Sequence, residues 1–234
     1  MNNLVDIIQN VINNINLNIN VINIVDGKTI TVCDTKHITI NKIVKNFNKY
    51  GSSGLKYKVI SFVEDTTVVV EPYGHSVPFA GSKLIAPEIT FLHGSPSSVN
   101  NEYAQVDQQT LNKTPFIWLL EPYDENLGES DSALEVSFDC RLFFMDWAYN
   151  QGWKNDEHDT NVIKPMKKLL EQFNGVIYND FSFRNTSVIR SRPRSRFGVV
   201  VTNRGSDRTI INEDLSGLEV EAELDLFDVE ICNC

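Results

Sequence analysis

The chain has 234 residues, with 21 basic and 31 acidic side chains and a formal net charge of −10. This charge argues against a general binder of nucleic acids or of anionic membrane surfaces. A chain of this length buries about 70% of its unfolded surface, so one large or two small domains form without disulfides or metals. The apolar runs are too short to cross a bilayer, and Met-Asn-Asn lacks the flank of a signal peptide, so we expect a protein made in a cytoplasm, with no membrane partner.

The first third of the chain predicts a helix followed by strands. Leu4, Ile8 and Val11 recur at helical spacing within residues 4–15. From Leu17 the period changes to two, and Asp26-Gly27 separates two alternating runs, which predicts a β-hairpin. Further strands are predicted at residues 56–63 and 66–71, with a linker at 95–101. We therefore expect residues 16–104 to form an inserted, small all-β, barrel-like domain.

The remaining residues predict a mixed core. Strands are expected at residues 114–121, ended by Pro122, and at 132–146, whose length implies a curved sheet. Residues 164–173 have helical periodicity, with Pro165 in the first turn and Gly175 as C-terminal cap. Strands are expected again at residues 176–183, at 197–202 and at 218–231. The expected fold class is α+β, in which residues 1–15 and 105–234 form one core of a curved antiparallel sheet packed with helices.

Candidate chemistry is sparse. The four cysteines are scattered and have no zinc spacing, which favours inert thiols. Asp156, Glu157, His158 and Asp159 form the densest group of potential metal ligands, but they precede a helix, where acidic residues cap free amides. The other histidines have no serine or cysteine nucleophile at a motif spacing. We therefore expect no enzyme, no cofactor and no metal site.

Two segments of opposite charge stand out. Residues 218–226 alternate apolar and acidic side chains, which predicts a strand with one buried and one negative face. The acidic residues are Glu219, Glu221, Glu223 and Asp225. Arginines occur at every second position of an earlier segment: Arg190, Arg192, Arg194 and Arg196. We expect these arginines to contact acidic residues of a neighbouring subunit, most plausibly the four above, which could alternatively face a lumen.

The order of these elements resembles the tail-terminator and tail-completion proteins of tailed bacteriophages. The resemblance rests on the amphipathic first helix, Glu-Pro-Tyr at 121–123, the long strand at 132–146, Lys-Pro-Met at 164–166, the arginine-rich hairpin, and Leu-Ser-Gly at 215–217. It is strongest to the neck or tail ring proteins of crAss-like phages, whose AT-rich genomes suit the many asparagines. It covers residues 1–15 and about 105–234, and the barrel-like insertion departs from the usual pattern.

The resemblance implies a structural virion protein, assembled in the cytoplasm of the bacterial host. Its copies would close into a ring, with twelve copies matching a portal or six matching a tail tube. Its partners would be the portal or adjacent neck and tail rings, tail proteins, and DNA that passes through the lumen without sequence-specific binding. The alternatives are a carbohydrate- or receptor-binding β module, with Tyr73, Phe79, Trp147 or Trp153 stacking on sugar, and a hydrolase whose residues 156–159 meet His75 or His93.

Overall fold

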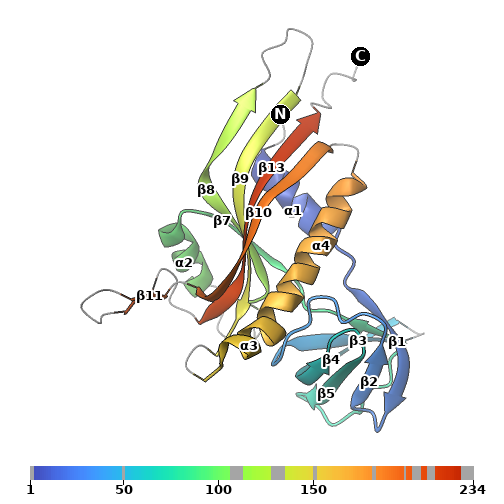
Figure 1. Ribbon diagram of the computed structural model, residues 1–234. Helices are drawn as coiled ribbons and strands as arrows, with labels where there is room; N and C mark the ends of the chain where they lie inside the picture. The colour runs from blue at the N-terminus through green and yellow to red at the C-terminus, as the bar shows by residue number, and fades with distance from the viewer. Residues whose placement is uncertain are drawn as a thin grey trace, which may run out of the picture.

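A computed structural model describes residues 3–48, 51–105, 113–127, 135–149, 152–180, 183–197, 199–201, 207–209 and 214–227. These residues form a closed β-barrel and a five-stranded sheet packed with helices (Figure 1). The fold is therefore α+β, mostly strands with few helices, and the barrel expected in the first half of the chain is confirmed.

The barrel consists of six antiparallel strands in the order β1-β2-β5-β4-β3-β6. Their bounds are Asn18–Val25 (β1), Thr29–Val32 (β2), Ile43–Asn48 (β3), Gly51–Val63 (β4), Thr67–Tyr73 (β5) and Lys83–Ile85 (β6). Alternate side chains point inward because successive residues of a strand face opposite sides. The interior is a hydrophobic core of its own, which includes Ile30, Tyr57 and Phe79.

The predicted hairpin at Asp26-Gly27 is present. Both residues have left-handed backbone angles, with φ of 54° and 60°, and the amide of Lys28 donates to the carbonyl of Val25 over 3.1 Å. This is the two-residue turn whose twist matches that of the flanking strands. The second predicted hairpin is also confirmed, because β4 pairs with β5 on either side of residues 64–66.

The five-stranded sheet has the order β10-β13-β9-β8-β7. Its strands are Thr90–Gly94 (β7), Phe116–Leu127 (β8), Glu135–Trp147 (β9), Phe183–Phe197 (β10) and Leu215–Phe227 (β13), and β7 is parallel to β8 while the other pairs are antiparallel. A short pair, Val199–Val201 (β11) and Asp207–Thr209 (β12), follows β10. Helices α1 (Leu4–Asn13) and α4 (Lys164–Tyr178) lie on one face of the sheet, and α2 (Pro96–Gln105) lies on the other (Figure 1).

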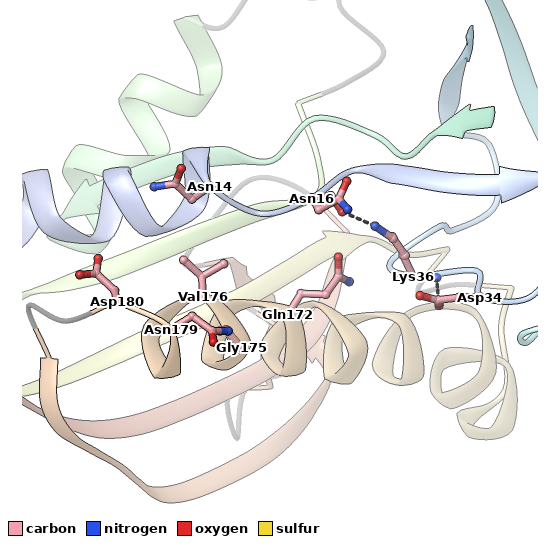
Figure 2. Close-up of a pocket in the computed structure, with 9 residues that line it drawn as sticks. All are labelled: Asn14, Asn16, Asp34, Lys36, Gln172, Gly175, Val176, Asn179 and Asp180. Atoms are coloured by element: carbon pink, nitrogen blue, oxygen red, sulfur yellow. Dashed lines mark hydrogen bonds between the residues drawn. The ribbon is translucent and has the colours of Figure 1, made fainter. Parts of the chain in front are cut away.

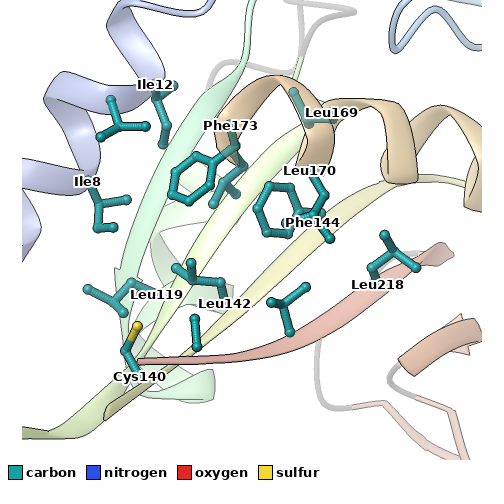
Figure 3. Packing of buried hydrophobic residues seen from close by; sticks show 14 of the residues in the cluster. Ile8, Ile12, Leu119, Cys140, Leu142, Phe144, Leu169, Leu170, Phe173 and Leu218 are labelled. Carbon is teal, nitrogen blue, oxygen red and sulfur yellow. The ribbon is translucent and has the colours of Figure 1, made fainter. Parts of the chain in front are cut away.

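The main hydrophobic core lies between the sheet and the helices α1 and α4. Figure 3 shows Ile8 of α1 and Phe173 of α4 directed toward side chains of the strands, such as Leu142 and Phe144. The rings of Phe144 and Phe173 meet edge to face, with centroids 5.5 Å apart. Each fully buried side chain of this size contributes about 1.5–3 kcal/mol. The apolar stripes that predicted both helices therefore fix them on this face.

Helix α4 continues directly from a short α-helix, α3 (Asn155–His158), and a π-helical turn, η1 (Asp159–Ile163). It does not end at Gly175 as predicted, but runs to Tyr178 with Asn179 as its C-cap. The strand expected at residues 176–183 is therefore wrong over residues 176–180, of which the first three belong to α4. Ile177 explains the difference, because it is buried and extends the apolar stripe of the helix by one turn.

Two further boundaries differ from the prediction. The segment expected to be a linker, residues 95–101, lies largely in α2, and β7 belongs to the five-stranded sheet rather than to the barrel. The last barrel strand is β6, after which the amide of Ala86 donates to the carbonyl of Leu17 over 2.9 Å. The barrel strands therefore occupy residues 18–85, whereas the sequence placed the whole of 16–104 in the inserted domain.

A buried ion pair joins the barrel to the sheet. Lys42, just before β3, contacts Asp146 of β9, and their side chains are only 5% and 0% exposed. The same lysine donates to the carbonyl of Thr114 over 3.0 Å, and the hydroxyl of Thr39 donates to Asp146 over 2.5 Å. Ions buried in this way are tolerated only when they are paired and hydrogen-bonded. The pair therefore fixes where the barrel sits on the sheet.

A second polar contact joins the barrel to α4. The ammonium of Lys168 bonds to Asp65 and lies 3.9 Å from Asp34 and 3.8 Å from Glu64. Its hydrogen bond holds the pKa of the Asp65 carboxyl below its ordinary value. One helical lysine thus gathers three carboxylates from two barrel loops.

Candidate functional site

The face of the sheet opposite α1 and α4, here called the outer face, is only partly covered. Near one end, Val99 of α2 packs on Trp118 and Phe143, whose stacked rings have centroids 4.7 Å apart. The indole of Trp118 donates to the carbonyl of Gly94 over 2.9 Å. Beyond this apolar end, the outward residues of β8, β9, β13 and β10 are charged or polar. The register of the strands sorts them into rows that run across the sheet.

The rows next to the apolar end contain the basic half of the outer face. In one row Arg190 and Arg141 flank Glu221, and in the next row Arg192 lies opposite Glu219. Arg194 lies opposite Gly217, one row further along. The basic half thus consists of four arginines and two glutamates: Arg141, Arg190, Arg192, Arg194, Glu219 and Glu221. Its formal charge is +4 − 2 = +2.

Glu219 is the centre of the basic half. Its side chain is only 5% exposed, although it lies on the outer face. One carboxylate oxygen accepts from Nε of Arg194 over 2.6 Å, and the other lies 3.4 Å from Nε of Arg141 and 3.8 Å from Arg192. Arg192 and Arg141 also reach Glu221, over 3.3 and 3.7 Å. Guanidinium groups cover this carboxylate because they match it in shape and hydrogen-bonding geometry.

The next rows contain the acidic half of the outer face, which consists of Asp124, Asp139, Glu223 and Asp225. Glu223 lies directly opposite Asp139, and Asp139 lies directly opposite Asp124. Asp225 follows in the adjoining row. Asn126 donates to Asp139 over 3.4 Å, but within the described residues no arginine, lysine or histidine forms an ion pair with these four carboxylates. Their formal charge is −4, and like charges directly opposite each other destabilise a sheet.

The structure brings together most of the charged residues that the sequence singled out, but it does so within one chain. Arg192 and Arg194 pair with Glu219 because β10 and β13 are antiparallel neighbours. These three residues thus have partners within one chain, and their contact with a neighbouring subunit stays a prediction. Arg190 is exposed and forms no ion pair within the described residues, so it is the most available of the described arginines for such a contact. The side chain of Arg196 lies outside the described residues.

Sequence reasoning missed three members of the outer face. Arg141 and Asp139 lie on β9, within the strand predicted at residues 132–146. Asp124 lies on β8 beyond Pro122, where the sequence wrongly predicts that the strand ends. Each faces outward by the same alternation that buries its neighbours in the core. The alternation was visible in the sequence, but the row in which each residue falls depends on strand register. An irregularity in the pairing of β8 with β9, between Leu120 and Asp124, shifts that register.

A polar cleft of about 890 Å³ lies on the other side of the sheet, between α4, the end of α1 and a barrel loop (Figure 2). Figure 2 shows Gln172 rising from α4 toward Asn16 and Lys36. The ammonium of Lys36 donates to the carbonyl of Asn16, and burial lowers its pKa. The amide of Gln172 donates to the carbonyl of Lys168 over 3.1 Å. The donors of the cleft are thus used inside the chain, and its lining contains no histidine or cysteine.

The group of potential metal ligands at residues 156–159 plays local roles. Glu157 accepts from the amide of Lys154 over 2.7 Å, as expected of a helix cap. His158 is buried and bonds to Ser216 over 2.9 Å. His75 contacts the carbonyl of Lys56 over 2.9 Å in the barrel, far along the chain from these residues. In the described part of the chain, no group of three or more His, Cys, Asp or Glu side chains is placed to hold a metal ion.

The aromatic residues considered for sugar stacking are not gathered on one surface. Phe79 is buried in the barrel core, edge to face with Tyr57. Tyr73 is 41% exposed at the end of β5. Trp147 and Trp153 meet at 74°, with ring centroids 6.0 Å apart, at the far end of the sheet. No platform shared by these four residues is therefore formed.

Comparison with protein-family models, with curated proteins and with solved structures gives no match. Within the described residues, none of the helices is both long and apolar enough to span a bilayer. The function is therefore argued from the geometry of the outer face and from the arrangement of the fold.

Proposed function

We propose that this protein is a structural subunit of a tailed-bacteriophage particle. Copies of the chain join into a ring in the neck or tail, which connects portal-proximal components to the tail and surrounds the DNA path. The role is assembly rather than catalysis. In this reading the five-stranded sheet with α1 and α4 is a tail-terminator-like core, and the barrel is a module added to it.

The observation that carries the proposal is the outer face. Its strands β9, β10 and β13 have 13, 15 and 13 residues, which is long for strands of globular proteins, typically about 5–6 residues. They extend past the helices that cover them (Figure 1). They present an ordered array of charges that a solitary domain does not need. Large uncovered and structured faces of this kind are typical of subunits that are completed by neighbours.

The edge of the sheet supports assembly that is controlled rather than open-ended. Strand β10 is an edge strand, and its free backbone groups could add strands without limit. Pro193 and the exposed arginines Arg190 and Arg194 lie on this edge, and proline and charge both discourage uncontrolled pairing. The subunit is therefore suited to defined contacts with specific partners, which are further copies of itself and the adjoining rings.

The charge of the chain suits a conduit for DNA. Non-specific affinity for DNA comes mainly from basic contacts to phosphates. The net charge of −10 repels phosphates, so DNA would pass such a ring without adhering. DNA is thus a passing partner in the proposal and not a bound ligand.

The test is the mass of the purified chain, measured by light scattering and native mass spectrometry and followed by electron microscopy. We expect a closed ring with a single copy number, twelve or six, or a subunit that closes into a ring when the adjoining ring is added. A chain that remains monomeric at high micromolar concentration, both alone and with purified phage necks or tails, would overturn the proposal.

A further inference from the structure

The charges of the outer face are sorted by sign along the strands. Adjacent rows are two residues apart, which is about 7 Å along a strand. The basic half, with formal charge +2, occupies the rows next to the apolar end, and the acidic half, with formal charge −4, occupies the rows toward the tips of β8 and β9. The face is therefore an electric dipole built across four strands.

Among the described residues, neither half has all of its charges paired. In the acidic half, Asp124, Asp139 and Glu223 lie in one row, and within the described residues their carboxylates have one contact, the hydrogen bond from Asn126. In the basic half, Arg192 and Arg194 are neutralised by Glu219 and Glu221, but Arg190 lies exposed in the row directly beside the acidic half. Repulsion within the acidic row persists until a positive surface approaches it.

A second copy of the chain supplies that surface. The basic half of one copy and the acidic half of another carry opposite charges and have the same row spacing, since both are parts of one sheet. Nucleic acid fits the face poorly, because the acidic half would repel phosphates beside any phosphate held by the arginines. A metal ion fits poorly as well, since the described residues form no group that could hold one.

We propose that the outer face is a self-complementary subunit contact. The basic half of one copy, led by Arg190, packs against the acidic half of the next copy, led by Asp139 and Glu223. Because the two halves differ, each copy uses one half toward each of two neighbours, and such a head-to-tail contact closes by rotation. The inference rests on the proposed function, since it takes the second copy to be the next subunit of the ring.

The contact is tested by charge reversal in the full chain. One variant, Arg190→Glu, reverses the charge at one exposed position, lowers the formal charge of the basic half from +2 to 0, and leaves the network around Glu219 intact. The other, Asp139→Lys with Glu223→Lys, reverses the charge at two positions and raises the formal charge of the acidic half from −4 to 0. Two exposed barrel residues provide matched controls, Lys56→Glu and Glu71→Lys. Circular dichroism and thermal unfolding confirm that each variant is folded, and light scattering over a dilution series measures self-association.

We expect each outer-face variant to self-associate about tenfold or more weakly than the unmodified chain, because one half loses its net charge and the substituted positions now repel their partners. The control variants should associate like the unmodified chain. An equimolar mixture of the two outer-face variants should assemble again, because Glu at position 190 of one variant meets Lys at positions 139 and 223 of the other. Raising the salt concentration should weaken assembly of the unmodified chain.

The outcomes separate this inference from the proposed function. Rings formed equally well by both outer-face variants would overturn the inference and leave the ring intact. Loss of association in both variants without rescue in the mixture would also overturn the inference, because complementary reversal must restore a true pair. If the unmodified chain is a closed dimer whose association follows the variant and mixture pattern, the pairing of the basic half with the acidic half stands, and both its head-to-tail arrangement and the ring are overturned.

Discussion

Removal of Lys42 should destabilise the whole protein. Its side chain is 5% exposed, and among the described residues its ammonium is the only cation that pairs with the fully buried carboxylate of Asp146. Replacement by methionine keeps the length of the side chain but leaves Asp146 with its two remaining donors, the Thr39 hydroxyl at 2.5 Å and the Trp147 amide at 2.6 Å. Breaking one partner of a buried pair costs about 3–5 kcal/mol. Against a total stability of about 5–15 kcal/mol, this is a large fraction.

The cost can be assigned by a double-mutant cycle. Asp146→Asn alone leaves the ammonium of Lys42 buried beside a neutral amide, so it should cost a similar amount. The double variant Lys42→Met/Asp146→Asn buries no charge, and we expect it to be less destabilised than the sum of the single variants by about 2 kcal/mol or more. Urea unfolding followed by circular dichroism measures all four free energies of unfolding. If each single substitution costs less than about 1 kcal/mol and the two costs simply add in the double variant, the reasoning is refuted.

The same experiment reports on how the barrel is coupled to the sheet. The barrel has its own core and was predicted to be an autonomous insertion. If the buried pair couples the two bodies, the unmodified chain should unfold in one transition. The Lys42→Met variant should then show two transitions, one for each body. Retention of a single steep transition in the variant would mean that other contacts, such as those of Lys168, maintain the coupling.

Three further substitutions test the packing and the pH dependence. Gly217→Ala should destabilise the chain by about 1–3 kcal/mol in urea unfolding, because the new Cβ would overlap the carbonyl of Phe144 on the neighbouring strand. Gly175→Ala is the contrasting substitution, because Gly175 lies in helix α4 and a new Cβ there would contact no other atom. This substitution should stabilise the folded chain by about 0.5–1 kcal/mol. Burial lowers the pKa of His37 to about 4, so its folded form resists protonation. The neutral imidazole of His37 therefore contributes fully to the free energy of unfolding above about pH 6.5. About 3 kcal/mol of that free energy is lost as the pH falls toward 4. His37→Gln should remove this part of the pH dependence.

The sequence predicted the elements whose periodicity is dictated by burial. The α1 stripe, the hairpin at Asp26-Gly27 and the alternation of residues 218–226 each have one buried face, and each is present in the structure. The α+β class and the barrel follow from the same patterns. These predictions succeed because the period of apolar residues is a local property of the chain.

The errors arise where tertiary contacts outweigh local signals. Pro96 opens a helix although its neighbours Ser, Asn and Gly suggested a linker, because Val99 docks α2 on the outer face. Gly175 was taken for a helix end, but the buried Ile177 continues the helix past it. The pairing of Arg194 with Glu219 was expected between chains and lies within one, because no pattern in the sequence specifies that β10 and β13 are neighbours.

The buried polar junction had no sequence signal at all. Lys42 and Asp146 are 104 residues apart in the sequence. Neither lies in a run of charged residues. A lysine just before one strand and an aspartate near the end of another are each ordinary in isolation. Lys42 and Asp146 become partners only where the barrel packs on the sheet. Sites formed by segments that are distant in the sequence are therefore found only from the three-dimensional structure.

The point where the chain enters and leaves the barrel has a consequence for the order of folding. The amide of Ala86 and the carbonyl of Leu17 are hydrogen-bonded at 2.9 Å, so the folded barrel holds its two ends together. An unfolded segment of about 70 residues between α1 and β7 would add about 4 kcal/mol of closure entropy to the docking of α1 on the sheet. Once the barrel has formed, that long loop is replaced by a single contact. Early barrel formation would thus hold the first helix close to β7 and help it to dock on a sheet whose strand β13 follows all of its other strands in the sequence.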